Sequence, residues 1–217
     1  MTDMVAELMQ KINNRLILAT ILHREMADMF WHIYLPGFAL MNEYQYLAEN
    51  KTQRNLKRYI ISTYHILPLD KNPESANVAM PLVGNKNRLT ITATDRWEII
   101  RKGIKAHVDW EMASLTEYQA VAGKLLQSGE ISVFNYLGDL IADVKKELVF
   151  VTDLYLEMQG HDFDIAQITE MQSDLFERFE YLISNLYRKS QKFHHWNSAY
   201  DPISRVDYDI RNDGDDS

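Results

Sequence analysis

Apolar side chains recur every three or four residues through most of the chain. The first series predicts a helix over about residues 2–34, because this spacing puts its members on one helical face. Pro36 and Gly37 then end the pattern, since Pro disfavours helical geometry in the residue before it and Gly permits a turn. A second helix is expected from about Phe38 to Ile66, before Pro68. The first stripe comprises Val5, Met9, Ile12, Leu16, Ala19, His23, Met26, Phe30 and Ile33.

A proline-rich connection separates these helices from the next pair. Residues 67–94 hold three of the five prolines and a short β-branched stretch, LTITAT, which favours an extended crossover. Thr94 or Asp95 is expected to cap the third helix, and Ser128 with Gly129 to end it. The stripe of this helix comprises Trp97, Ile100, Ile104, His107, Glu111, Leu115, Tyr118, Ala122 and Leu125.

Two further helices follow. The fourth is predicted to end near Gly160, and the fifth to run over about residues 165–192. Their stripes comprise Val133, Leu137, Leu140, Val144, Leu148, Val151, Tyr155 and Met158, and then Ile168, Met171, Leu175, Phe179, Leu182 and Leu186.

The order of these elements predicts the fold class. Two helical hairpins joined by one long crossover are the ferritin-like arrangement of an all-α four-helix bundle, here over residues 1–160. An additional C-terminal helix is expected over residues 161–196. Residues 197–217 form an acidic tail that is poor in apolar groups and is expected to be disordered.

Composition narrows the classes of function. The chain of 217 residues has a formal net charge of −8, which disfavours general attraction to nucleic acid. It has no Cys, so disulfides, thiolate metal sites and thiol nucleophiles are excluded. No apolar run reaches about 18 residues, and the N-terminus lacks the pattern of a secretory signal. These features predict a cytoplasmic protein without a membrane span.

Two stretches resemble the Dps-like branch of the ferritin superfamily. Residues 129–146 (GEISVFNYLGDLIADVKK) follow the start of that family's fourth helix, with Leu137 and Ile141 at its recurring apolar places. Residues 31–44 (WHIYLPGFALMNEY) are similar to its first-helix end, glycine turn and second-helix opening. The resemblance covers roughly residues 5–158. It implies a homo-oligomeric shell, iron oxidation and protection against oxidative stress.

The same resemblance implies an iron site between subunits, whose ligands this chain lacks. Phe30 and Asn42 stand where the family has its two His, and Lys57 and Ile61 stand near its Asp and Glu. Phe and Ile cannot ligate iron. Moreover, the second helix has no acid after Glu49, so the usual inter-subunit ferroxidase site is predicted to be missing.

Another metal site is conceivable at the bundle centre. The chain has no Glu-x-x-His, the pair that di-iron bundles use on two helices. His107 and Glu111 are four residues apart on the inward stripe, and His23 lies in the middle of the first stripe. Asp143 and Glu147 share that spacing at the edge of the fourth stripe. These five residues are the candidate metal ligands, with iron as the candidate cofactor. Alternatively, His107 and Glu111 hydrogen-bond each other or an Arg, and no metal is bound.

Three functions are compatible with these patterns. The first is a Dps-like protein of iron handling, with ferroxidase-type activity if a metal site is retained. The second is a non-enzymatic helical oligomer that acts as a scaffold or interaction module. The third is a metal-dependent hydrolase that uses the candidate residues of the third and fourth helices. Members of the Dps-like branch that bind DNA often do so with a Lys-rich N-terminal extension. Residues 1–11 of this chain carry a single Lys with two acids before it, so direct DNA binding is not expected.

Overall fold

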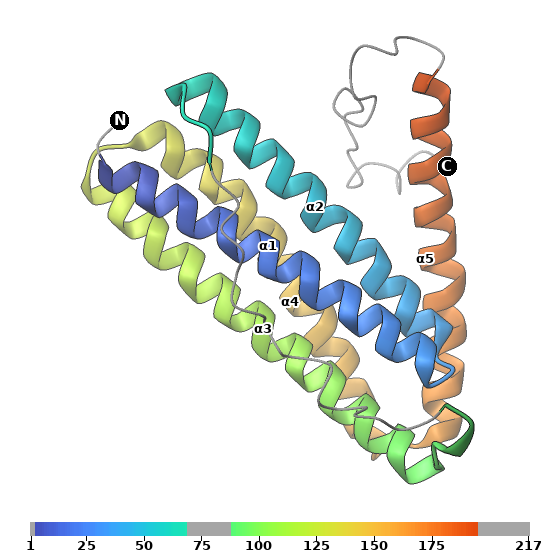
Figure 1. Ribbon diagram of the computed structural model, residues 1–217. Coiled ribbons are helices and arrows are strands. Elements are labelled where there is room, and N and C mark those ends of the chain that lie inside the picture. The colour runs from blue at the N-terminus through green and yellow to red at the C-terminus, as the bar shows by residue number, and fades with distance from the viewer. Residues whose placement is uncertain (1–2, 69–87, 195–217) are drawn as a thin grey trace, which may run out of the picture.

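The computed structural model describes residues 3–68 and 88–194, and within these ranges it contains helices and no strand. The described residues form five long helices, whose arrangement Figure 1 shows, and they confirm the predicted all-α class. Their bounds are α1 Asp3–His32, α2 Pro36–Tyr64, α3 Ala93–Gln127, α4 Ile131–Gly160 and α5 Ile165–His194, and a short 3-10 helix, η2, spans Arg88–Thr90. The expected acidic tail and most of the expected crossover lie outside the described residues.

Short turns connect the helices within each hairpin. Between α1 and α2, Tyr34 has a positive φ of 63°, and Pro36 occupies the first turn of α2, where its missing N–H costs no hydrogen bond. Between α3 and α4, Gly129 takes a φ of 79°. The expected N-cap of α3, Thr94 or Asp95, was wrong, because the N-cap is Thr92, two or three residues earlier. Asp95 instead completes a capping box with it.

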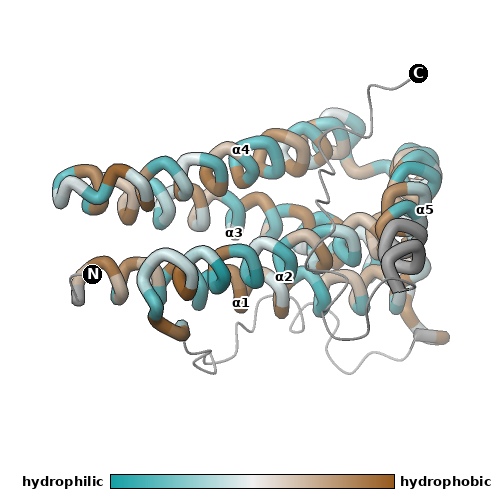
Figure 2. Tube along the Cα trace, turned by 90° about the horizontal axis from the view of Figure 1, so that it is seen from above, coloured by the Kyte–Doolittle hydropathy of each residue, from teal (hydrophilic) through white to brown (hydrophobic). Residues whose placement is uncertain are grey.

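The two hairpins, α1–α2 and α3–α4, pack side by side into a four-helix bundle. In Figure 1, α2 and α3 run in the same direction, so the chain must travel the length of the bundle between them. Figure 2 shows the bundle from above, with α5 across one end. In the described residues, no helix carries an apolar stretch long enough to cross a bilayer.

The bundle interior has two apolar parts with a polar layer between them. The first part, next to α5, includes Met26, Phe30, Phe38 and Ile104. The second, at the other end, includes Ile12, Leu56, Tyr118 and Leu137. Between them lie the buried polar side chains His23, Asn42, Gln45, Glu49, His107, Glu111 and Ser114. A polar layer of this size in a bundle centre requires a partner for each group.

Helix α5 packs against the first turn of α2. The backbone N–H of Gly37 donates to Gln172 Oε1 at 3.1 Å. A Cβ atom at residue 37 would lie 1.9 Å from the carbonyl oxygen of Gln172, so only Gly allows this approach. Further along α5, the ring of Phe179 packs against Tyr44 and Phe150.

Candidate metal centre

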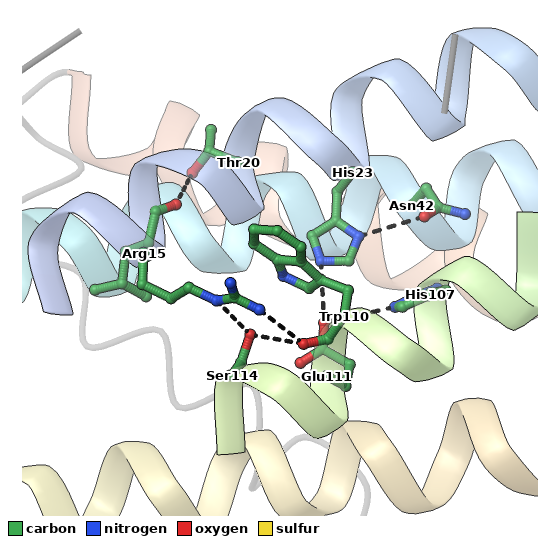
Figure 3. A network of polar contacts seen from close by, with 9 residues as sticks. Arg15, Thr20, His23, Asn42, His107, Trp110, Glu111 and Ser114 are labelled. Carbon is green, nitrogen blue, oxygen red and sulfur yellow. Dashed lines mark hydrogen bonds and ion pairs between the residues drawn. The ribbon is translucent and has the colours of Figure 1, made fainter. Parts of the chain in front are cut away.

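Four side chains from three helices converge in the polar layer. They are His23 of α1, His107 and Glu111 of α3, and Glu147 of α4, and one ligand atom of each lies within 4.8 Å of the others. His23 Nε2 is 3.6 Å from Glu111 Oε1, and His107 Nε2 is 3.9 Å from the same oxygen. Figure 3 shows both imidazoles directed toward this carboxylate. We call these four residues the central cluster.

Local sequence explains why these groups point inward. His107 and Glu111 are one helical turn apart and therefore share a face of α3. Gly103, one turn before His107, leaves room for the side chain of Met29 on α1, because a Cβ there would lie 2.8 Å from Met29 Cε. The rings of His23 and His107 lie at a centroid distance of 4.8 Å in an edge-on arrangement.

The ligand atoms of the central cluster are buried and lack hydrogen bonds. His23 and His107 are 0% exposed, and Glu111 is 1% exposed. Both ring nitrogens of His107, Nε2 of His23, Oε1 of Glu111 and Oε1 of Glu147 have no hydrogen-bond partner. The separation of 3.9 Å between His107 and Glu111 is too long for the direct hydrogen bond considered above. Each orphaned buried group costs about 1–3 kcal/mol, a cost that a bound cation would remove.

Burial also sets the protonation of the central cluster. It lowers the pKa of His23, and it lowers the pKa of His107 well below its ordinary value, with the neighbouring His23 acting in the same direction. Burial raises the pKa of Glu111 to about 8, against an opposing effect of Arg15. It raises the pKa of Glu147 to about 8 as well, with Glu111 adding to the shift. Neutral imidazoles and carboxyl groups that ionise beside a cation suit a divalent transition metal.

Asn42 on α2 orients one of the imidazoles. Its Nδ2 donates to the carbonyl oxygen of Phe38 at 2.9 Å, which turns Oδ1 toward His23. The distance from His23 Nδ1 to Asn42 Oδ1 is 3.4 Å. With Nδ1 as the donor, His23 keeps the lone pair on Nε2, which faces Glu111. Asn42 thus stands where the resemblance places a His ligand, and here it positions a His instead.

Arg15 is the cation beside the central cluster. Its Nε donates to Ser114 Oγ at 2.9 Å and its Nη2 to the Trp110 carbonyl at 3.0 Å, as Figure 3 shows. The guanidinium lies 3.5 Å from the centroid of the Trp110 ring. Burial lowers the pKa of Arg15, and Glu117, whose carboxylate is 3.9 Å from Arg15 Nε, acts in the opposite direction and raises it. These contacts hold a positive charge in place without making Arg15 a ligand.

The structure separates the fifth candidate ligand from the other four. Asp143 lies one turn before Glu147 on α4, but its side chain is 46% exposed and 3.8 Å from Lys146 Nζ. It is therefore outside the central cluster. The difference follows from its place at the edge of the apolar stripe, where one turn of the helix changes the environment.

Sequence reasoning missed one buried acid. Glu49 of α2 is 9% exposed, and its Oε2 has no hydrogen-bond partner. Burial raises its pKa well above the ordinary value, and Glu147 and Glu111 add to the shift. A signal was present, because Phe38, Asn42, Gln45 and Glu49 follow one another at steps of four, three and four on the buried face of α2.

Comparison with solved structures assigns the architecture. The open-pore ferritin of the archaeon Archaeoglobus fulgidus superimposes with a TM-score of 0.66 at 15% identity, over 81% of this chain and 96% of that one. The apo-ferritin of Pseudo-nitzschia multiseries gives 0.64 at 8% identity, over 79% and 98%. This chain has the ferritin fold.

A ferritin variant soaked in iron is also similar, with a TM-score of 0.64 at 9% identity over 79% of this chain and 98% of that one. No protein-family model and no curated protein matches the sequence. The predicted ferritin-like bundle with an additional helix is confirmed, and the Dps-like branch stays a prediction. At these identities the similarity concerns the fold, so the case for the metal centre rests on the side chains of this chain.

Proposed function

We propose that this protein handles iron by binding Fe(II) at the central cluster. One observation carries the proposal: two neutral imidazoles and two carboxyl groups meet in the bundle interior with their ligand atoms unpartnered. Imidazole nitrogen and carboxylate oxygen are ligands that iron accepts in proteins. The similar solved structures are ferritins, and one of them was soaked in iron, which supports the choice of iron.

The residues of the central cluster have separable roles in this proposal. His23 and His107 would bind through Nε2 without losing a proton, because burial keeps both rings neutral. Glu111 and Glu147 would release their protons on binding and supply the negative charge. These residues would hold Fe(II) as the substrate of a ferroxidase-type activity, in which each Fe(II) would lose one electron to dioxygen and become Fe(III). The apolar parts on either side of the polar layer keep bulk water from the site.

The finer assignment is a Dps-like protein that protects against oxidative stress. It is supported by the resemblance of residues 129–146, the turn and first half of α4. We place the protein in the cytoplasm, which its lack of Cys favours, and expect a homo-oligomer, which that resemblance implies. Binding to DNA and to membranes is not part of the proposal.

Anaerobic titration with Fe(II) followed by a pulse of oxygen tests the proposal. The wild-type chain should bind iron and develop the near-ultraviolet absorbance of Fe(III), and the double variant His107→Ala/Glu111→Gln should lose both signals. A matched control exists in His161→Ala/Glu157→Gln, because these residues are also four apart but exposed at the end of α4. The control should behave as wild type.

The scaffold alternative makes the opposite prediction. Under it, the wild-type chain takes up no more iron than buffer does, and neither double variant changes anything. Loss of iron binding in the exposed control, with retention in the buried variant, would move the site to the surface and end the present proposal. Far-UV circular dichroism on each protein verifies that the helices are intact.

A further inference from the structure

We infer that the central cluster holds a single divalent transition-metal ion per chain, bound by His23, His107, Glu111 and Glu147, and not a pair of bridged ions. The inference rests on the proposed function and specifies the centre on which it depends. Two observations carry it: the dimensions of the ligand set and the placement of its imidazoles.

The dimensions of the central cluster match the shell of one ion. Metal–ligand distances for imidazole and carboxylate are about 2.0–2.2 Å, so neighbouring ligand atoms on one ion lie roughly 3–4 Å apart. Ions in two-metal sites are about 3.5–4 Å apart, so ligands at opposite ends of such a pair are on the order of 8 Å apart. The four ligand atoms of this chain all lie within 4.8 Å of one another.

Both imidazoles of the central cluster face the same carboxylate oxygen and could therefore bind the same ion. His23 Nε2 and His107 Nε2 are 3.6 Å and 3.9 Å from one oxygen, Oε1 of Glu111. Di-iron bundles instead distribute their imidazoles over two Glu-x-x-His pairs, one on each of two helices, and this chain contains no such pair. The remaining His residues of the described part of the chain, His32, His65, His161 and His194, lie at or near helix ends. Among the described residues, a second ion would therefore lack an imidazole.

The donor atoms of the central cluster also determine which class of ion it can bind. Two nitrogen and two oxygen donors with no thiolate suit Zn(II), Co(II), Fe(II) and Mn(II), whereas Ca(II) and Mg(II) prefer oxygen donors alone. Zn(II) favours four ligands and generally binds such donors more tightly than Fe(II) does. We therefore expect Zn(II) to compete with Fe(II) for the same four ligands.

Anaerobic titration of the full chain with Co(II) tests this inference, with stoichiometry and the visible absorption spectrum as readouts. We expect one Co(II) per chain, a four-coordinate spectrum, and displacement by one equivalent of Zn(II). Elemental analysis after gel filtration should likewise give one Fe(II) per chain. Glu147→Gln should weaken binding at least tenfold, whereas Glu49→Gln should retain one ion per chain.

The possible failures separate this inference from the proposed function. Two ions per chain, reduced to one by Glu49→Gln or Asp143→Asn, would establish a dinuclear centre; the single-ion inference would fall and iron handling would stand. No binding of Fe(II), Co(II) or Zn(II) would overturn both. An unchanged affinity in Glu147→Gln, with normal helical content, would remove that residue from the ligand set and overturn the inference as stated.

Discussion

The two faces of α3 carry pairs with the same spacing and opposite character. On the outer face, Lys105 pairs with Asp109 across four residues, and both side chains are about half exposed. On the inner face, His107 and Glu111 have the same spacing but are buried, and their facing atoms form no hydrogen bond. Water satisfies the outer pair, whereas nothing among the described residues satisfies the inner one. Spacing brings two groups together, and burial determines what they can do.

Replacing Glu111 by Leu gives the largest expected difference between these faces. Leu has a similar volume and removes an unpartnered buried acid, so the metal-free protein should become more stable by about 1–3 kcal/mol while losing its metal. Urea unfolding with and without Fe(II) or Zn(II) measures both effects. The outer control, Asp109→Leu, should leave metal binding unchanged. A destabilised metal-free Glu111→Leu protein would show that the carboxyl group is satisfied without metal.

The inner carboxyl groups should also make stability depend on pH. Glu111 and Glu147 have pKa values of about 8 in the folded protein, against about 4.3 in an unfolded chain. Between these values the folded state keeps protons that the unfolded state has lost, so stability falls as pH rises. The lowered pKa values of His23 and His107 act in the opposite direction, but only below about pH 6.5.

The window from about pH 6.5 to 8 therefore isolates the carboxyl groups. The free energy of unfolding of the metal-free protein should fall there by up to about 1.4 kcal/mol per pH unit for each group. Urea unfolding at several pH values measures the slope, which Glu111→Gln should reduce and Asp109→Asn should not. A flat profile in the wild-type chain would mean that the inner acids are ionised in the folded state.

The bundle interior also contains a side chain that orients a proposed ligand on a neighbouring helix: Asn42 of α2 faces His23 of α1. Asn42→Leu removes the acceptor for His23 Nδ1, and metal affinity should fall about tenfold, as for other groups that orient a ligand. Asn42→Asp keeps an acceptor and should recover most of that affinity. Isothermal titration with Zn(II) compares the three proteins. Equal affinities would show that the ring is held by packing alone.

The smallest effect is expected on the outer face. Exposed pairs four residues apart contribute about 0.3–0.5 kcal/mol, so Lys105→Ala should change stability by less than about 1 kcal/mol. Its effect should shrink further in high salt. Thermal unfolding at low and high ionic strength measures this, and metal binding should not respond.

Much of the fold could be predicted from sequence, because helical periodicity is a local property. The stripes located five helices to within a few residues, and Pro36 and Gly129 marked the two tight turns. The cap of α3 was misplaced because Thr92, Thr94 and Asp95 are all acceptable capping residues, and sequence does not say which one leaves the helix. Sequence therefore identifies the residues that can cap the helix, and the backbone conformation of Thr92 shows which of them does so.

The central cluster was only partly predictable. His23, His107 and Glu111 lie on stripes, so their inward direction follows from spacing alone. Asp143 and Glu147 could not be ranked, since both lie near the edge of a stripe and only packing decides which is covered. Glu49 was missed because the resemblance directed attention to Lys57 and Ile61, further along the same helix. The buried face of α2 itself contained the information.

The contact between Gly37 and Gln172 limits which substitutions this end of the bundle tolerates. With α5 in place, no side chain larger than hydrogen fits at residue 37, although Ala has a higher intrinsic helix propensity than Gly. A chain of this fold without α5 would be released from that restriction. The extra helix and the glycine beneath it are therefore a matched pair, and a loss of the first would make the second replaceable.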